Sequence, residues 1–256
     1  MFDTHLHTEF STDSKMKIEE AIKASQKSNL GIIVTEHMDL GLKGEEKNFC
    51  FDVDEYFSEY NKYKINKVLL GIEIGLEKEH LEEARKIINN NPFDYALGSI
   101  HLVDGNDLYY KDFYKDKSKK EAFNRYLEVM FETLKKFDFV DSLGHIDYIS
   151  RYAYYDDKEL YYEDYYERID EILKLISNRE IAMEINTRRL DDDKAFKNLL
   201  KIYKRFNELG GKIVTIGSDS HDLKSIGKNF DKAKYIADSC NLKVVYHKNR
   251  KIYYDK

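Results

Sequence analysis

Short runs of apolar and β-branched residues alternate along the chain with longer amphipathic stretches. The apolar runs predict strands at about 1–5, 31–36, 68–74, 94–101, 139–145, 180–186 and 212–218. The amphipathic stretches predict helices at about 17–28, 54–64, 79–90, 119–136, 160–177, 193–209 and 230–239. Ile169, Ile172, Leu173 and Ile176 illustrate the helical spacing of apolar residues.

Seven strand-then-helix units in series are typical of an α/β fold with a parallel sheet. They favour a seven-stranded (β/α)7 barrel over an open sheet followed by a second domain. At 256 residues, with no composition break that would mark a linker, the chain is expected to form a single domain over 1–256.

Charge and cysteine content exclude several classes of protein. A net charge of −6 leaves no basic excess for general nucleic-acid binding, and no apolar run approaches the length of a membrane span. Cys50 and Cys240 lack a CxxC spacing and are expected to be free thiols. With no recognisable signal peptide, these features predict a cytoplasmic protein. The oligomeric state stays open, and a homo-oligomer is one possibility.

Side chains that can bind metal follow the predicted strands, at the end where catalytic groups lie in a β/α barrel. His5 and His7 are two residues apart in an extended segment, so both imidazoles face one point. The further candidates are Asp13, His37, Glu73, His101, His145, Glu184, Asn186, Asp219 and His221. One such histidine is commonly structural, but a set at successive strand ends predicts a metal site.

The order of these motifs carries a resemblance. His-x-His at the start is followed by Glu-His, the lone Glu73, Gly-Ser-Ile-His, Gly-His-Ile-Asp and Ser-Asp-Ser-His-Asp. In the identity and order of these motifs, nearly the whole chain resembles the PHP (polymerase and histidinol phosphatase) family of metal-dependent phosphoesterases. The length and the segments Gly-Ser-Ile-His and Glu-Ile-Asn-Thr are most similar to its stand-alone histidinol-phosphate phosphatases. The resemblance implies a distorted seven-stranded barrel with the metal site at the C-terminal ends of the strands.

The resemblance also implies a site for three divalent metal ions. It assigns one ion to His5, His7, Glu73 and Asp219, a second to Glu73, His101 and His145, and a third to Asp13, His37 and His221. Many family members have histidine where this chain has Asp13. A mixed set of imidazoles and carboxylates suits zinc, manganese or iron.

The implied reaction is hydrolysis of L-histidinol phosphate to L-histidinol and phosphate, a step of histidine biosynthesis, with metal-activated hydroxide attacking phosphorus. Glu73 is expected to bridge two metals, and Asp219 or His221 to pass a proton to the leaving alkoxide. Arg151 and Arg188 are candidates to bind the phosphate, since a guanidinium can donate two parallel hydrogen bonds. Asp39, Glu9 and the tyrosines of 152–155 are candidates to hold the rest of the substrate.

Other functions remain open at this point. The chain could hydrolyse a nucleotide, an oligonucleotide end or another small phosphate ester, although an exonuclease should show a basic track that is missing here. A non-catalytic metal-binding module and an amidohydrolase-like enzyme are further alternatives. The tyrosine-rich segment 152–166 is either amphipathic cover for a helix or a lid beside the site. His80 and His247 are expected to be surface or packing residues.

Overall fold

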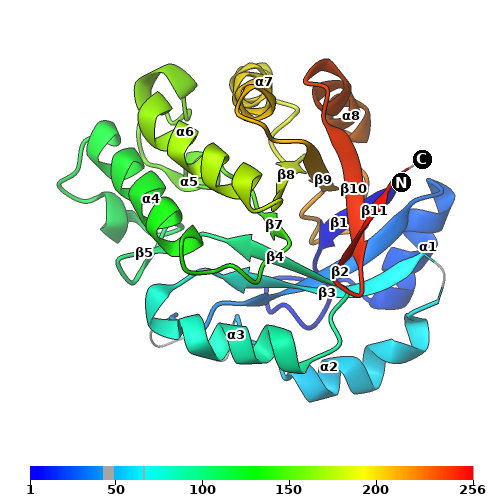
Figure 1. Cartoon of the computed structure of the whole chain (residues 1–256). Coiled ribbons are helices and arrows are strands. Elements are labelled where there is room, and N and C mark those ends of the chain that lie inside the picture. The colour runs from blue at the N-terminus through cyan, green and yellow to red at the C-terminus, as the bar shows by residue number, and fades with distance from the viewer. Residues whose placement is uncertain (43–48, 66, 256) are drawn as a thin grey trace.

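The computed structural model describes residues 1–42, 49–65 and 67–255. In these ranges, the main sheet has nine strands, and the first seven in its order are parallel and form the barrel (Figure 1). In their hydrogen-bonded order they are β1 (Phe2–Leu6), β2 (Gly31–Met38), β3 (Val68–Gly75), β4 (Tyr95–Ser99), β7 (Ser142–Leu143), β8 (Ala182–Asn186) and β9 (Ile213–Gly217). They match the predicted strands in number and order, although β4, β7 and β8 are shorter than predicted.

The last of these strands returns to the first. The Asp219 N–H donates to the His5 carbonyl at 2.7 Å, and the His7 N–H donates to the Ser220 carbonyl at 2.9 Å. These bonds join the end of β9 to the end of β1 and close the sheet. The predicted seven-stranded barrel is therefore confirmed.

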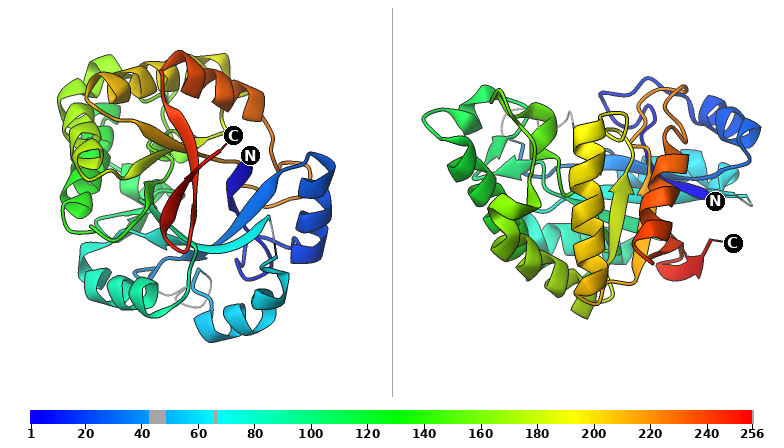
Figure 2. Two further views of the ribbon diagram at one scale, coloured as in Figure 1. Left: turned by 45° about the vertical axis from the view of Figure 1, so that its right-hand side comes forward. Right: turned by 90° about the horizontal axis from the view of Figure 1, so that it is seen from above.

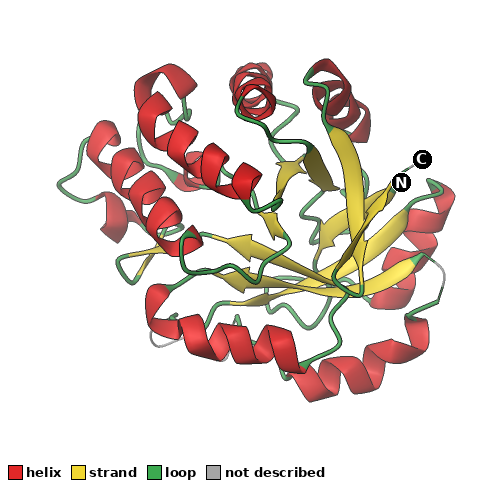
Figure 3. Ribbon diagram, in the orientation of Figure 1, coloured by secondary structure: helices red, strands yellow, loops and turns green. Residues whose placement is uncertain are grey.

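Helices surround the strands on the outside, as Figure 3 shows. They are α1 (Ile18–Lys27), α2 (Val53–Tyr60), α3 (Leu81–Asn90), α4 (Lys119–Leu134), α6 (Tyr162–Asn178), α7 (Asp193–Glu208) and α8 (Phe230–Ser239). Shorter helical turns are α5 (Ile149–Tyr152), η1 (Asn61–Tyr63), η2 (Lys78–His80) and η3 (Lys111–Tyr114). Within the described ranges, no helix is both long and apolar enough to cross a membrane.

Capping residues set where the outer helices begin. The Asp192 carboxylate accepts the N–H groups of Lys194 and Ala195 at the start of α7. At the start of α4, Ser118 and Glu121 bond each other's backbone N–H in a capping box. The apolar face of each helix then packs against the barrel, which holds the strand ends in fixed positions.

A C-terminal hairpin was absent from the predicted elements. Strand β10 (Lys243–Lys248) runs parallel to the start of β9, and β11 (Lys251–Tyr254) returns antiparallel to it. Tyr246 stacks on Phe2 with ring centroids 4.1 Å apart, and His247 stacks on Tyr95 at 5.3 Å. The hairpin thus covers the end of the barrel where the strands begin (Figure 2), and His247 is a buried packing residue.

A second small hairpin, β5 (Leu102–Val103) and β6 (Asn106–Asp107), follows β4. It lies at the opposite end of the barrel, where the main strands finish. The exposed Tyr109 and Tyr110 come directly after it. This end of the barrel therefore carries irregular segments that can line a site.

Candidate metal centre

The carboxylate of Glu73, on β3, lies at the centre of a cluster of imidazoles and is fully buried. Its Oε2 atom is 3.3 Å from His5 Nε2, 3.5 Å from His7 Nε2 and 2.9 Å from His37 Nδ1. These histidines come from the ends of β1 and β2. His5 and Glu73, 68 positions apart in the chain, therefore converge because only β2 separates their strands in the barrel.

The other oxygen of Glu73 faces β4 and β7. Oε1 is 3.3 Å from His101 Nε2 and 3.0 Å from His145 Nε2. The Ser99 hydroxyl also donates to Oε1, at 2.7 Å. The two oxygens of one carboxylate thus face two different groups of histidines, which is the geometry expected of a bridging ligand.

Asp219 closes the cluster from the β9 side. It occupies the left-handed region with a φ of 54° in the turn after β9. Its Oδ1 atom lies 3.7 Å from His5 Nε2 and 3.5 Å from His7 Nε2. The two imidazoles of His-x-His therefore share one carboxylate in addition to Glu73.

A third group lies nearer the surface. The Asp13 carboxylate is 3.0 Å from His221 Nε2 and 3.7 Å from His37 Nε2. Burial would raise the pKa of Asp13, but the two imidazoles lower it well below its usual range. The carboxylate that replaces the family's usual histidine thus lies within reach of both imidazoles expected to share its ion.

The donor atoms outnumber the hydrogen bonds that they can make with one another. His5 Nε2 and His7 Nε2 lie 3.0 Å apart, so only one proton fits between them. Glu73 Oε2 and His37 Nδ1 are buried and, among the described residues, lack a partner in hydrogen-bonding geometry. Buried polar atoms of this kind require an explanation. The converging donors fit divalent metal ions, which imidazole and carboxylate both bind.

Two further carboxylates lie beside the Nδ1 atoms of imidazoles whose Nε2 atoms face the cluster. Glu184 Oε1 lies 2.6 Å from His5 Nδ1, and its other oxygen accepts the backbone N–H of His145 at 2.8 Å. Asp39 lies 2.9 Å from His101 Nδ1. Holding Nδ1 in this way leaves Nε2 free to face the cluster. Asp39, which the sequence suggests only as a substrate contact, thus also contacts a predicted metal ligand.

The mutual proximity of these groups shifts their ionisation. Burial would raise the pKa of Glu73, but His5, His101 and His37 lower it well below its usual range. Burial opposes charge on His37, yet Glu73 and Asp13 raise its pKa to about 10. For His7, burial and the neighbouring His37 and His221 lower the pKa well below its usual range. The cluster therefore combines charged and neutral imidazoles around the negatively charged carboxylate of Glu73.

A cavity of about 270 Å³ opens above the cluster. Two arginines reach it. Arg151, on α5, is nearly buried and donates to Asp219 and, at 2.8 Å, to Asn186 Oδ1. Arg188 follows β8, is largely exposed, and lies 3.4 Å from the Asp219 carbonyl. The next residue, Arg189, points away from the cavity to Asp147 and Glu159.

Aromatic residues form the remaining wall of this cavity. Tyr109 and Tyr148 each contact Tyr152 edge-on with centroids 5.2 Å apart, and Tyr110 and Phe49 line it too. The sequence suggests Tyr152 for this wall but not the other four, because nothing local shows which loops meet there. Glu9 is not among the lining residues; it is exposed and pairs with Lys17.

The tyrosine-rich segment divides at this wall. Tyr152 faces the cavity, whereas the Tyr155 hydroxyl donates to the Lys117 carbonyl at 3.0 Å and Tyr165 is buried in α6. Tyr155 and Tyr165 are therefore packing residues, Tyr154 and Tyr166 are exposed, and Tyr152 lines the cavity.

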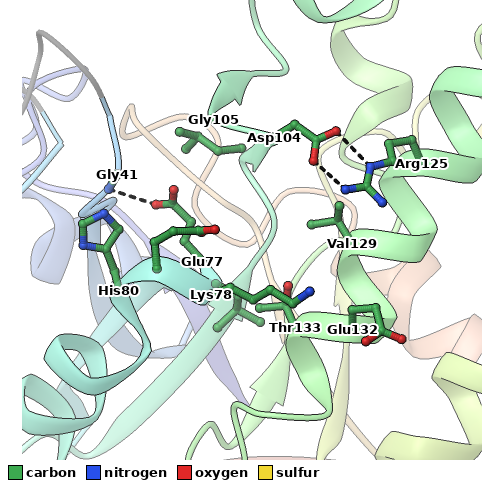
Figure 4. Close-up of a pocket in the computed structure, with 13 residues that line it drawn as sticks. Gly41, Glu77, Lys78, His80, Asp104, Gly105, Arg125, Val129, Glu132 and Thr133 are labelled. Atoms are coloured by element: carbon green, nitrogen blue, oxygen red, sulfur yellow. Dashed lines mark hydrogen bonds and ion pairs between the residues drawn. The ribbon is translucent and has the colours of Figure 1, made fainter.

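A second groove lies beside the barrel between η2 and α4 (Figure 4). Asp104 pairs with Arg125 on one side, and Glu77 accepts the Gly41 N–H at 2.9 Å on the other. The groove also contains Glu79 and Glu132. Lys78 and Arg125 also line it, but His80 is its only histidine among the described lining residues, whereas four histidines of the cluster line the cavity with Arg151 and Arg188.

Comparison with known proteins extends these observations. Residues 3–188 match the model of the PHP domain. The chain is 57% identical over 256 residues to a probable histidinol-phosphatase of Clostridium acetobutylicum, covering 99% of each chain. It is 33% identical over 242 residues to the histidinol-phosphatase of Lactococcus lactis, covering 91% of this chain and 88% of that protein.

A solved structure is similar over the full length. The crystal structure of histidinol phosphate phosphatase from Lactococcus lactis, complexed with zinc, L-histidinol and phosphate, superimposes with a TM-score of 0.90. The sequence identity is 31%, covering 100% of this chain and 98% of that chain. The resemblance carried by the motifs is confirmed, and the chain belongs to the PHP domain family.

Proposed function

We propose that this protein hydrolyses L-histidinol phosphate with water to L-histidinol and inorganic phosphate, using divalent metal ions bound around Glu73. One observation supports this most strongly: the cluster lies beneath a small cavity that is lined by two arginines and by aromatic rings. The Lactococcus lactis relative has been solved with zinc, L-histidinol and phosphate, which are a metal ion and the two products of this reaction.

The ligand sets proposed here come from the resemblance to the family and divide the cluster differently from proximity alone. By proximity, the donor atoms form the groups His7, His37 and His221; His5, His7 and Asp219; His5, Glu73 and His145; and His37, Asp39 and His101. His5, His7, Glu73 and Asp219 would hold one ion, Glu73, His101 and His145 a second, and Asp13, His37 and His221 a third. Zinc is the ion of the Lactococcus lactis structure, and manganese or iron would suit the same donors. Such ions would lower the pKa of water towards neutrality and offset the negative charge of the phosphate oxygens.

The arginines have different tasks in this proposal. Arg188 is exposed at the mouth of the cavity, where its guanidinium lies 3.5 Å from the Asp219 carboxylate, and it would turn from there onto a phosphate oxygen. Arg151 is held by Asp219 and Asn186, so its guanidinium keeps the Asp219 carboxylate in place and adds positive charge below the phosphate. The phosphate of the substrate would therefore lie between Arg188 and the cluster.

A proton must reach the alkoxide oxygen of the leaving histidinol. Burial would raise the pKa of Asp219, but Arg151 and His5 lower it well below its usual range, so Asp219 is a poor proton donor. His221 lies at the cavity, with its Nδ1 3.0 Å from the Asp219 carbonyl. As a ligand of the third ion His221 would be neutral, so we favour a water molecule beside His221 as the proton donor over either side chain.

The aromatic wall and its acidic neighbours suit the rest of the substrate. Tyr109, Tyr110 and Tyr152 offer ring faces and edges to an imidazole, and Asp39 and Asp107 supply negative charge near an ammonium group. A biosynthetic role would place the protein in the cytoplasm, and both described cysteines are free thiols.

Phosphate release tests this function. The zinc-loaded protein should hydrolyse L-histidinol phosphate with a kcat/KM at least about a hundredfold above that for AMP or glycerol 3-phosphate, since several contacts to the imidazole and ammonium are lost with those esters. Removal of the metal should abolish release. A preference for AMP, or undiminished release after removal of the metal, would contradict the proposal.

A further inference from the structure

Glu36 precedes the predicted ligand His37 on β2, but its side chain points to the opposite face of the strand. It is fully buried. The Thr8 N–H lies 3.1 Å from both of its oxygens, the Thr8 hydroxyl also donates to it, and the Ser11 hydroxyl donates to Oε2 at 2.5 Å. Three protein donors therefore converge on one carboxylate that belongs to none of the metal-ligand groups.

The hydroxyl of Ser11 connects this carboxylate to the cluster. A serine hydroxyl has a single hydrogen, and here that hydrogen is used by Glu36. Its oxygen must then act as acceptor towards its other two neighbours, the backbone N–H of His37 at 3.1 Å and Nδ1 of His7 at 3.1 Å. His7 Nδ1 can contact this oxygen favourably only if it carries a hydrogen.

The tautomer of His7 follows from this sequence of donors. With the hydrogen on Nδ1, the Nε2 atom of neutral His7 has a free lone pair. Nε2 is the atom that faces His5 Nε2 at 3.0 Å, Glu73 Oε2 at 3.5 Å and Asp219 Oδ1 at 3.5 Å. Glu36 thus fixes the hydrogen on His7 Nδ1 through Ser11, and His7 Nε2 is left able to bind a cation.

We propose that Glu36 is a positioning residue that acts through Ser11 to fix His7 in the tautomer with Nε2 free for a metal ion. The metal-ligand role of His7 is part of the proposed function, so the inference rests on it. His5 is held by Glu184 directly, whereas His7 is held by Glu36 through a hydroxyl. Tyr60 extends the same set of bonds, since its hydroxyl lies 2.8 Å from that of Thr8.

Two variants separate this role from simple packing. Ser11→Ala removes the hydroxyl and keeps the carboxylate, while Glu36→Gln keeps the shape and introduces an amide that can donate to Ser11. Each should weaken the tightest-bound zinc by about ten- to a hundredfold in competition with a chelator, as is typical when the partner of a ligating histidine is lost. Glu159→Gln is the matched control, because Glu159 is also buried but bonds Arg189; its zinc affinity should stay within about twofold of wild type.

Nitrogen-15 NMR of the histidine rings gives a readout that packing alone would not change. In metal-free wild-type protein at pH 8, His7, assigned by comparison with His7→Asn, should carry its hydrogen on Nδ1. In Ser11→Ala a share of His7 should move its hydrogen to Nε2. The measurement on the wild type requires neither Ser11→Ala nor Glu36→Gln to fold.

The two proposals fail in different ways. Failure of the wild type to bind zinc would refute the metal site itself, while the tautomer of His7 would still test the contact with Ser11. Tight zinc binding by wild type, Ser11→Ala and Glu36→Gln alike would overturn the positioning role of Glu36. A wild-type His7 with its hydrogen on Nε2 would overturn it as well.

Discussion

His5 Nε2 and His7 Nε2 lie 3.0 Å from each other in the centre of the barrel mouth. Two imidazole nitrogens at this distance repel if both carry a hydrogen or if both expose a lone pair with nothing between them. A cation bound by both nitrogens removes the conflict. With one hydrogen between them the two nitrogens form a hydrogen bond, and a metal ion bound by both, as we propose, would replace that hydrogen.

Zinc binding should release protons. The pKa of His37 is raised to about 10, and those of His5 and His101 are raised well above 6.5 by Glu73 and its neighbours, so these rings are protonated at pH 7.5 in the metal-free protein. A ligating imidazole must be neutral. Zinc affinity should therefore rise with pH between 6 and 9, with roughly one to three protons released per chain at pH 7.5.

Calorimetry in two buffers of different ionisation enthalpy measures this number. Titration of metal-free protein should give binding heats that differ between the buffers. Equal heats in both buffers would mean that the histidines are already neutral, contrary to the charges inferred for the cluster.

Glu73→Gln should lower kcat/KM by about a hundredfold or more, because an amide cannot supply two anionic oxygens to the groups on either side of it. His80→Ala is the control, since His80 lies on the surface beside α3 and contacts only Glu83 among the described acidic side chains. Steady-state kinetics and zinc content should be measured for both. Equal activity of the two variants would remove Glu73 from the centre of the site.

Arg188→Ala should raise KM and lower kcat/KM by about ten- to a hundredfold, the cost of roughly 1.5–3 kcal/mol for a lost charge-assisted bond to the phosphate. Zinc content should not change. If full activity survives, the phosphate must be bound elsewhere, with Arg151 as the next candidate.

Arg189→Ala is the matched control for Arg188. From spacing alone it should leave activity within about twofold of wild type. The structure adds a cost in stability, because Asp147 and Glu159 would lose their partner in a nearly buried pair. The melting temperature of Arg189→Ala should be lower than that of the wild type, while its kcat/KM per folded molecule should be unchanged.

Asp13→His should retain the third ion. The Asp13 carboxylate lies between His221 and His37, and an imidazole there would supply the ligand that many family members use. Metal analysis should show unchanged stoichiometry. Loss of metal together with activity would show that Asp13 has another task, such as holding the segment before α1.

The strands and their polar ends were predictable because the barrel repeats one simple rule. A buried parallel strand is apolar, and the side chains after it emerge at the same end as those of its neighbours. His5, Glu73 and His145 could therefore be grouped without knowing any distance. Alternation along β2 likewise separates His37 from Glu36.

The remaining features of the fold and the site depend on contacts between separate segments, which no local sequence pattern predicts. Tyr109 and Tyr110 reach the cavity only because the β5–β6 hairpin folds towards Tyr152. The β10–β11 hairpin is a short, half-exposed segment whose partners, Phe2 and Tyr95, lie more than 140 residues earlier in the chain. The hydroxyl that joins Glu36 to His7 likewise comes from a loop.

Anomalous diffraction from crystals of the zinc-loaded protein with phosphate tests the central claim most directly. The account predicts zinc peaks on both sides of the Glu73 carboxylate, within about 2.0–2.2 Å of the ligating nitrogen and oxygen atoms. It also predicts phosphate between these peaks and Arg188. A cluster that holds no zinc in fully folded protein, or phosphate bound in the acidic groove between η2 and α4 instead, would contradict it.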